Sequence, residues 1–328
     1  MHAPTARSSD DASAIVSAPA LPPFLHDRLP FDRCAVALGG EAGVDAGRRI
    51  HVVDHGPRDA PTVLMLHGNP MWSFLWRKVM ALQQAKGGDA VRLVAPDLLG
   101  LGFSSHLPRA RDHTLERHVQ AIAAVVRALD LRDIVLAIQD WGGPIGVGVA
   151  AAMPERIAGL VIANTAVVLP DRLRGSRFHR FARRPLISDL VFRVLGFPMR
   201  TLHKVQGDPA SIRGDVARAY RWPMRRMRDR VAPLALARMV PDTEHHPTYA
   251  AMRANQNWLT AWDGPTALVW GLRDPILGRA LPRHRRALPN APVHEAPDAG
   301  HFLQEEVPDR FDAAIRDVRR RATARRGA

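Results

Sequence analysis

Cysteine is nearly absent from this sequence: Cys34 is the only one among 328 residues. A single thiol excludes an intramolecular disulfide and a metal cluster held by several cysteines. Aromatic residues make up only 6% of the chain, and only Tyr220 and Tyr249 carry a phenol. No apolar run is long enough to cross a bilayer as a helix. The sequence therefore predicts neither a disulfide scaffold nor a membrane span.

Lysine is also scarce, because Lys78, Lys86 and Lys204 are the only three, while the formal net charge is +14. Such a charge is compatible with binding to nucleic acid or to a membrane surface. The skew toward arginine, however, indicates a compositional bias as much as a function. We interpret the arginines, which concentrate in 172–230 and 316–328, as a solvated basic face. We expect no nucleic-acid partner and no membrane partner.

The first 30 residues are rich in Ala, Ser, Pro and Asp. This composition is typical of a segment that cannot bury enough apolar surface to become ordered. The segment lacks the basic start and long apolar stretch of a signal peptide. We therefore predict a flexible N-terminal tail over 1–30 and a cytoplasmic protein.

Short apolar runs alternate with helical patterns along much of the chain. The runs are rich in Val, Ile and Leu, which is typical of strands buried on both faces of a parallel sheet. They cover 49–56, 62–68, 92–98, 133–140, 158–166, 265–272 and 293–301. Helical patterns cover 115–131, with Thr114 as the expected N-cap, and also 143–154 and 301–321. This alternation predicts an α/β fold with a mostly parallel sheet.

The alternation breaks in an arginine-rich stretch punctuated by prolines, with helix-like pieces at 187–197 and 215–222. We interpret this stretch as a helical cap inserted above the carboxyl edge of the sheet. The predicted organisation is a tail over 1–30, a core over 31–168 and 247–321, a cap over 169–246 and a basic tail over 322–328.

The stretch AIQDWGGPIG (137–146) places an acid, Asp140, between a predicted strand and a glycine-rich helix start. A strand, a sharp turn and a helix form a nucleophile elbow, which projects its central residue at the helix N-terminus. An aspartate there is also a common helix N-cap. The motif alone leaves both interpretations open.

Two further polar residues follow predicted strands: Asp274 in WGLRDPIL and His301 in APDAGH. Ligands of open α/β sheets bind outside the carboxyl ends of the strands. The order nucleophile, acid, histidine is that of α/β-hydrolase triads. Asp274 could alone be a turn residue and His301 a surface residue, but together with Asp140 they favour catalysis.

The sequence HGNP (67–70) also follows a predicted strand. Such a turn can aim the backbone N–H of Asn69 at the nucleophile, and the N–H of Trp141 would point to the same place. Two such donors would form an oxyanion hole.

The motifs now resemble one family specifically. LHGNPMWSFLWR (66–77), APDLLGLGFSS (95–105), IQDWGGPIG (138–146), the segment 255–277 and APDAGHFLQEE (296–306) are similar to the haloalkane dehalogenases of the α/β-hydrolase superfamily. The combination of HGNP with QDWGG is the distinctive one. The matching segments span about 240 residues, which is almost all of the predicted folded part.

The resemblance implies an α/β-hydrolase fold: a mostly parallel eight-stranded sheet flanked by helices, with a helical cap after the sixth strand. It implies a nucleophile at Asp140, a base at His301 and an acid at Asp274. It assigns the side chains of Asn69 and Trp141 to halide binding.

The implied reactants are a small halogenated hydrocarbon and water, with halide as a product, and neither a cofactor nor a metal is implied. The resemblance is also compatible with a homo-oligomer. Asn164 stands where other members carry the triad acid, and we interpret it as structural, like Asp97 in its loop.

A carboxylate suits this substrate because the electrophile is a saturated carbon. Its reference pKa is about 4, so it needs no activating base at neutral pH. It can displace halide and leave an alkyl ester, which water activated by His301 then hydrolyses.

Three alternatives remain open. An epoxide hydrolase would share Asp140, Asp274 and His301 but would need tyrosines in the cap, and this chain has only Tyr220 and Tyr249. A coelenterazine-type monooxygenase resembles the same set of residues. A non-catalytic hydrolase homologue that binds a ligand or nucleic acid is supported only by the basic charge.

Overall fold

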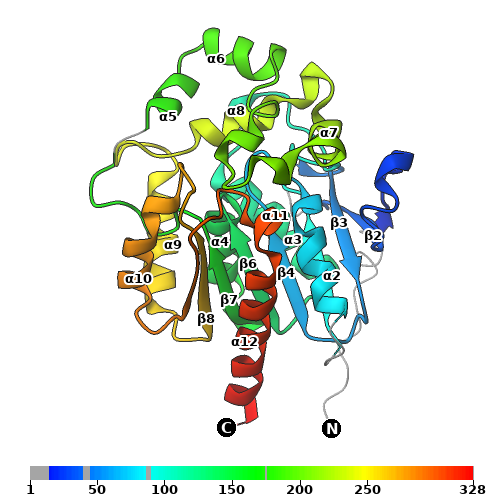
Figure 1. The fold of residues 1–328 in the computed structure, drawn as a ribbon, viewed down its shortest axis with the longest axis vertical. Helices are drawn as coiled ribbons and strands as arrows, with labels where there is room; N and C mark the ends of the chain where they lie inside the picture. The colour runs from blue at the N-terminus through cyan, green and yellow to red at the C-terminus, as the bar shows by residue number, and fades with distance from the viewer. Residues whose placement is uncertain (1–14, 40–44, 86–89, 174–175, 328) are drawn as a thin grey trace.

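The computed structural model describes residues 15–39, 45–85, 90–173 and 176–327. A nine-stranded sheet with the order β1-β2-β3-β5-β4-β6-β7-β8-β9 forms its centre (Figure 1). The strands are β1 (Ile15–Ser17), β2 (Arg33–Ala37), β3 (Arg49–His55), β4 (Thr62–Leu66), β5 (Arg92–Pro96), β6 (Ile134–Gln139), β7 (Ile157–Ala163), β8 (Thr266–Gly271) and β9 (Val293–Ala296). Strands β5, β4, β6, β7, β8 and β9 pair in parallel with their neighbours in this order. The pairs β1–β2, β2–β3 and β3–β5 are antiparallel. The predicted mostly parallel α/β sheet is confirmed, with nine strands in place of eight.

The central strands are the continuous apolar runs of the sequence. Every residue of β4, β5, β6 and β8 is buried, because helices cover both faces of the sheet. The register places Leu64 beside Leu136 and Leu136 beside Leu160, so one apolar layer continues across three strands. The carboxyl ends of these strands therefore lie along one edge.

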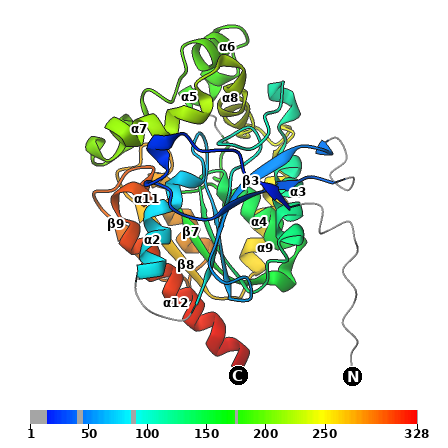
Figure 2. The ribbon, with the colours of Figure 1, turned by 90° about the vertical axis from the view of Figure 1, so that its right-hand side faces the viewer.

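Helices flank the sheet on both sides. Figure 2 shows α2 and α12 on one side and α3, α4 and α9 on the other. The α-helices are α2 (Arg77–Ala85), α3 (Leu115–Ala128), α4 (Gly142–Ala152), α5 (Arg177–Ala182), α6 (Ile187–Asp189), α7 (Gly214–Arg221), α8 (Val231–Arg238), α9 (Tyr249–Ala261), α10 (Leu281–Ala287), α11 (Leu303–Glu306) and α12 (Pro308–Gly327). Thr114 caps α3 as predicted, since its hydroxyl accepts the N–H of Arg117 at 3.2 Å.

The prediction of a flexible tail over 1–30 is wrong for residues 15–30, while residues 1–14 lie outside the described residues. Strand β1 extends the sheet by pairing Ile15 with Val36. Beyond it, Leu25 and Leu29 are buried in the core. The physical reason is the spacing of Leu21, Leu25 and Leu29, which places three apolar side chains toward the body of the protein despite the polar composition around them.

The segment 322–328, predicted as a basic tail beyond the last helix, belongs to that helix where the structure describes it. Helix α12 continues to Gly327, and Ala322 is buried. Arg325 near its end pairs with Asp263 at 2.7 Å. Arginine and alanine are good helix formers, so the segment extends the helix and does not fray at its basic residues.

The segment between β7 and α9 contains short helices that lie above the sheet, at the upper end of Figure 1. Helices α5 and α8 and the π-helix η6 (Leu190–Val194) share a small apolar cluster of Phe192, Ala182, Leu234 and Ala237. Residues 169–246 are called the cap below, and the rest of the described chain is called the core.

Candidate active site

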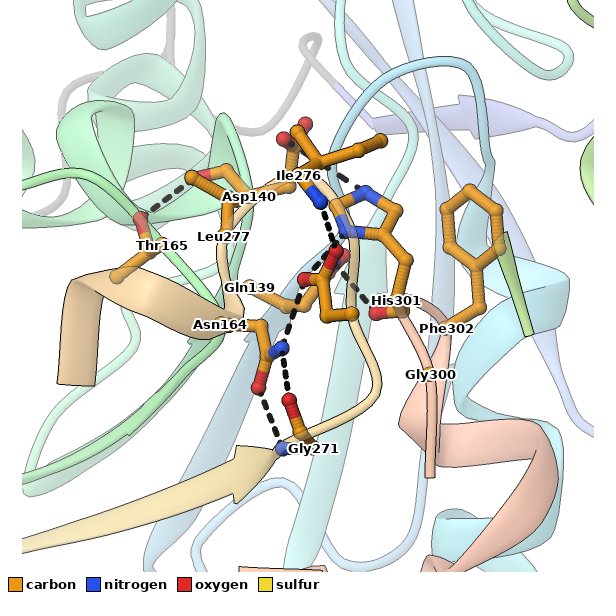
Figure 3. A network of polar contacts seen from close by, with 12 residues as sticks. Gln139, Asp140, Asn164, Thr165, Gly271, Ile276, Leu277, Gly300, His301 and Phe302 are labelled. Carbon is orange, nitrogen blue, oxygen red and sulfur yellow. Dashed lines mark hydrogen bonds and ion pairs between the residues drawn. The ribbon is translucent and has the colours of Figure 1, made fainter. Parts of the chain in front are cut away.

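Asp140 occupies the turn between β6 and α4 with φ = 49°, a left-handed conformation that is uncommon for a residue with a side chain. Its backbone is fixed from both sides: its N–H donates to Asn164 O at 3.0 Å, and Thr165 Oγ1 donates to its carbonyl at 2.7 Å (Figure 3). Gly142 permits the turn, because a Cβ there would lie 2.2 Å from the carbonyl oxygen of Leu66. This is the geometry of a nucleophile elbow.

His301 lies beside this turn (Figure 3), between the carboxylates of Asp140 and Asp274. Its Nδ1 lies 2.9 Å from Asp274 Oδ2, and its Nε2 lies 3.8 Å from Asp140 Oδ2. The first distance is a hydrogen bond and the second is too long for one. The three residues predicted as nucleophile, base and acid therefore lie in one line, with a gap between the base and the nucleophile.

Asp274 is held by donors that the sequence analysis did not assign. Asn164 Nδ2 donates to Asp274 Oδ2 at 2.7 Å, and the N–H of Ile276 donates to Oδ1 at 2.7 Å. Asn164 is itself fixed by the backbone of Gly271. Its Oδ1 accepts a hydrogen bond from the Gly271 N–H at 2.8 Å, and its Nδ2 donates to the Gly271 carbonyl at 3.0 Å. Asn164 is structural, as predicted, but the group that it positions is the carboxylate beside His301.

The two predicted oxyanion donors lie at the carboxylate of Asp140. The N–H of Asn69 donates to Asp140 Oδ1 at 2.7 Å, and the N–H of Trp141, the next residue, also acts to lower the pKa of this carboxyl. Gly68 allows the approach, since a Cβ there would lie 2.3 Å from Asp140 Cβ. Negative charge on this carboxylate would therefore meet the N–H dipoles of both residues.

Burial and charge act against each other in the line of three residues. Burial raises the pKa of Asp140 above its ordinary value, and nearby His301 and the two backbone N–H groups only partly offset this. Burial would also raise the pKa of Asp274, but His301, Asn164 and Ile276 together bring it below its usual range. Burial lowers the pKa of His301, and the neighbouring Asp274 and Asp140 carboxylates more than reverse this, so the net pKa is raised.

The side chains of Asn69 and Trp141, predicted to bind halide, come from the two turns that form the oxyanion site. Asn69 Nδ2 donates to the carbonyl oxygen of Pro233 at 3.0 Å, which links the HGNP turn to cap helix α8. Because an amide nitrogen carries two hydrogens, one N–H remains. Trp141 is 6% exposed, and its indole N–H has no acceptor within the described part of the chain.

The loop that carries His301 is clamped by the cap. The N–H of His301 donates to the carbonyl of Val205 at 2.8 Å, and Gln206 bonds both the N–H and the carbonyl of Phe302, at 2.9 and 3.2 Å. From the core, Gln139 Nε2 donates to the His301 carbonyl at 3.1 Å. Gln206 gave no signal in the sequence because it lies in the stretch that matches the family poorly.

The neighbouring loop is fixed as the sequence analysis predicted for Asp97. Its buried carboxylate accepts the N–H groups of Ser73 and Phe103, at 2.7 and 2.8 Å, and contacts His51 Nδ1 at 2.8 Å. Asp97 thus holds the backbone after β4 and β5 together. Its donors are all internal, which is consistent with a positioning role.

Both tyrosine hydroxyls have partners away from the Asp140 turn. Tyr220 is fully buried and its hydroxyl donates to Glu305, a carboxylate that also pairs with Arg77. Tyr249 begins helix α9, and its hydroxyl contacts Glu244 at 3.3 Å. These contacts weigh against the epoxide hydrolase alternative, which requires tyrosines directed at the substrate.

The described residues also contain no group of three or more His, Cys, Asp or Glu side chains arranged to hold a metal ion. No helix in the same residues is long and apolar enough to span a bilayer.

A model of the α/β hydrolase fold family matches residues 61–308. A haloalkane dehalogenase from Mycolicibacterium paratuberculosis is 31% identical over 260 residues, which is 79% of this chain and 83% of that protein. Haloalkane dehalogenase 1 from Mycobacterium tuberculosis is 36% identical over 253 residues, covering 75% of this chain and 79% of that protein.

Solved structures agree with these sequence matches. The haloalkane dehalogenase DatA from Agrobacterium tumefaciens superposes with a TM-score of 0.71 at 27% identity, covering 83% of this chain and 94% of that chain. The tetrameric haloalkane dehalogenase DpaA from Paraglaciecola agarilytica has a TM-score of 0.73 at 23% identity and covers 93% of this chain and 97% of that chain. At that identity the second match supports the fold alone.

Proposed function

Since the chain belongs to the haloalkane dehalogenase family of the α/β-hydrolase superfamily, we propose that it hydrolyses the carbon–halogen bond of a small haloalkane, giving an alcohol and a halide ion. The observation that carries this proposal is the line from Asp140 through His301 to Asp274, with the 3.8 Å gap between base and nucleophile. In this arrangement the carboxylate is free to attack, and a water molecule beside it is within reach of the base.

In the first step, Asp140 Oδ2 attacks the carbon that bears the halogen. A carbon–oxygen bond forms as the carbon–halogen bond breaks, and the bonding pair leaves with the halide. The developing anion needs donors in a site with little water. The remaining amide N–H of Asn69 and the indole N–H of Trp141 supply them. Because no proton moves in this step, it requires only that Asp140 be ionised.

In the second step, water attacks the ester carbonyl carbon and His301 Nε2 accepts its proton. The negative charge on Oδ1 is stabilised by the N–H groups of Asn69 and Trp141. Collapse of this intermediate expels the alkoxide, which takes the proton back from His301. Asp140 is regenerated as a carboxylate, and Asp274 stabilises the imidazolium in between.

The experiment that tests this proposal removes the base and leaves the nucleophile. His301→Phe is treated with 1-bromobutane, and bromide release and protein mass are measured together. We expect one equivalent of bromide, no further turnover and a butyl group on the peptide that contains Asp140. His294→Phe, on half-buried β9 away from this turn, is the matched control and keeps steady turnover.

Two results would contradict the proposal. A folded His301→Phe protein that releases no bromide and stays unmodified would exclude Asp140 as the nucleophile. Continued turnover at the wild-type rate would exclude His301 as the base.

A further inference from the structure

The far end of the cap exposes an apolar surface. Of the nine large apolar side chains exposed in the described part of the chain, six lie on two neighbouring cap segments. We call these six the cap tip: Leu186, Ile187, Leu190, Val194, Leu195 and Met227. Leu186 is 84% exposed, which is costly for an apolar side chain in water unless another surface covers it.

The helical segment that carries the cap tip is apolar on both sides. Phe192 and Ser188, on its inner side, are buried against helix α8 and its neighbours. Ile187, Leu190 and Val194 face away from that cluster. Figures 1 and 2 show α6 at the end of the molecule opposite the C-terminus, and the side chains of Ile187, Leu190 and Val194 are exposed there.

A basic pocket adjoins the cap tip. It has a volume of about 420 Å³ and is lined by Met199, Met224 and the arginines Arg200, Arg221, Arg225 and Arg230. Arg230 links it to the tip, since its Nη1 donates to the carbonyls of Arg193 and Val194, both at 3.0 Å. The pocket and the apolar surface therefore form one continuous region.

None of the four arginines pairs with a carboxylate within the described residues. Arg230 donates to four backbone carbonyls of the cap, so the other three carry the charge that is free to meet an anion. Other cap arginines do have such a partner, as Arg238 pairs with Asp189 at 2.7 Å. Across 169–246 the sequence has seventeen Lys and Arg residues against seven Asp and Glu, so the cap carries +10 of the formal net charge of +14. The region is therefore complementary to a surface that combines anionic groups with hydrocarbon.

We propose that the cap tip docks on an anionic phospholipid membrane, with the apolar side chains in the acyl boundary and a lipid phosphate in the arginine pocket. An apolar surface with a basic border is the pattern of proteins that lie on a membrane without spanning it. Arginine heads bind phosphate while their stems cover apolar surface. Aliphatic side chains favour lipid over nucleic acid, whose bases stack on aromatic residues. The docking would hold the protein where lipophilic compounds concentrate. It would also mean that the arginines of the cap contact lipid and do not only form a solvated basic face, as the sequence predicted.

The test is sedimentation of the full chain with vesicles of phosphatidylcholine, with and without a one-third share of phosphatidylglycerol. We expect binding to the anionic vesicles only. Leu190→Asp should lower the partition coefficient about tenfold, and Arg200→Gln about fivefold, because each basic residue near an anionic surface contributes about 1 kcal/mol.

The matched controls are Leu272→Asp and Arg286→Gln, an exposed leucine and an exposed arginine on the core. They should bind like the wild type, and circular dichroism checks that all variants are folded. Equal weakening by Arg286→Gln would overturn the proposal in favour of unspecific charge attraction. No sedimentation with anionic vesicles would also overturn it, and light scattering that shows an oligomer dissociated by Leu190→Asp would then identify a second copy as the occupant.

Discussion

The core and the cap hold their charges differently. In the core, Arg92 is buried and pairs with Asp54 at 2.7 Å, and Arg117 pairs with Asp45 at 2.6 Å. In the cap, Arg200 and Arg221 have no carboxylate partner within the described residues. Buried charges must be paired to be tolerated, whereas exposed ones are stabilised by water. The core therefore holds its buried charges in fixed pairs, and the cap presents many charges to its surroundings.

This difference predicts that single substitutions of the site residues in the core lower the rate of the reaction by large factors. Those in the cap should act on docking and on stability by smaller amounts. The following variants test that contrast in order of decreasing effect.

Among these further variants, the largest effect is expected at Asp274. Asp274→Asn removes the charge that orients and stabilises His301, and turnover should fall about 1,000-fold or more, by analogy with a triad acid in serine proteases. The side chain of Asn164 lies 2.7 Å from Asp274 Oδ2, so adding Asn164→Asp places a carboxylate beside the lost one. Turnover of the double variant should therefore be about tenfold higher than that of Asp274→Asn. Steady-state halide release measures both. Turnover within a few-fold of wild type for Asp274→Asn would disprove the assignment of the acid.

A smaller loss is expected from Trp141→Phe. It removes the indole N–H and keeps an aromatic ring, so halide displacement should slow about 100-fold, the usual cost of one preorganised donor. Trp258→Phe, on helix α9, is the control and should leave the rate unchanged. Rapid-mixing measurement of the first bromide released separates this step from ester hydrolysis. An unchanged first step would remove Trp141 from halide binding.

The pH dependence tests the electrostatics of His301. The base must be neutral to accept a proton from water, so ester hydrolysis should fail as the pH drops through the raised pKa of His301. Asp274→Asn removes the charge that raises this pKa, so the acid limb of its residual turnover should move to lower pH. A pH profile of turnover for both proteins checks this. A limb that stays in place would mean that Asp274 does not set the pKa.

The smallest effects are expected from the two tyrosines. Tyr220→Phe leaves the buried carboxylate of Glu305 without one donor, which should lower the free energy of unfolding by about 1–3 kcal/mol. Tyr249→Phe, whose hydroxyl is exposed, should change it by less than about 0.5 kcal/mol. Urea denaturation measures both, and halide release should be unaffected. Turnover of styrene oxide by the wild type that either variant abolishes would instead favour the epoxide hydrolase alternative.

The sequence predicted the core well because its signals are local. A buried parallel strand is a continuous apolar run, and the turn after it must carry small residues, so the runs before Asp140 and His301 located both residues. Asn164 shows the limit of this reasoning. Its position after β7 was evident, but its hydrogen bond to Asp274 joins residues 110 positions apart and depends on how β7 and β8 pair.

The cap was harder to predict for a physical reason. Its short helices owe their positions to contacts with the core and not to a periodic pattern of their own. Two such contacts are the hydrogen bonds from His301 N–H to the Val205 carbonyl and from Asn69 Nδ2 to the Pro233 carbonyl. Composition also misled at the N-terminus, where it indicated a flexible tail, while a few leucines order the segment from residue 15 onward.

The most direct measurement of the central claim, that Asp140 is a nucleophile, is a single turnover in water enriched in oxygen-18. With enzyme in excess over 1-bromobutane, the alcohol takes its oxygen from the carboxylate. We therefore predict unlabelled butanol in that first turnover, and oxygen-18 in the peptide that contains Asp140, as read by mass spectrometry. Labelled butanol and an unlabelled Asp140 would mean that water attacks the haloalkane directly, which would contradict the account.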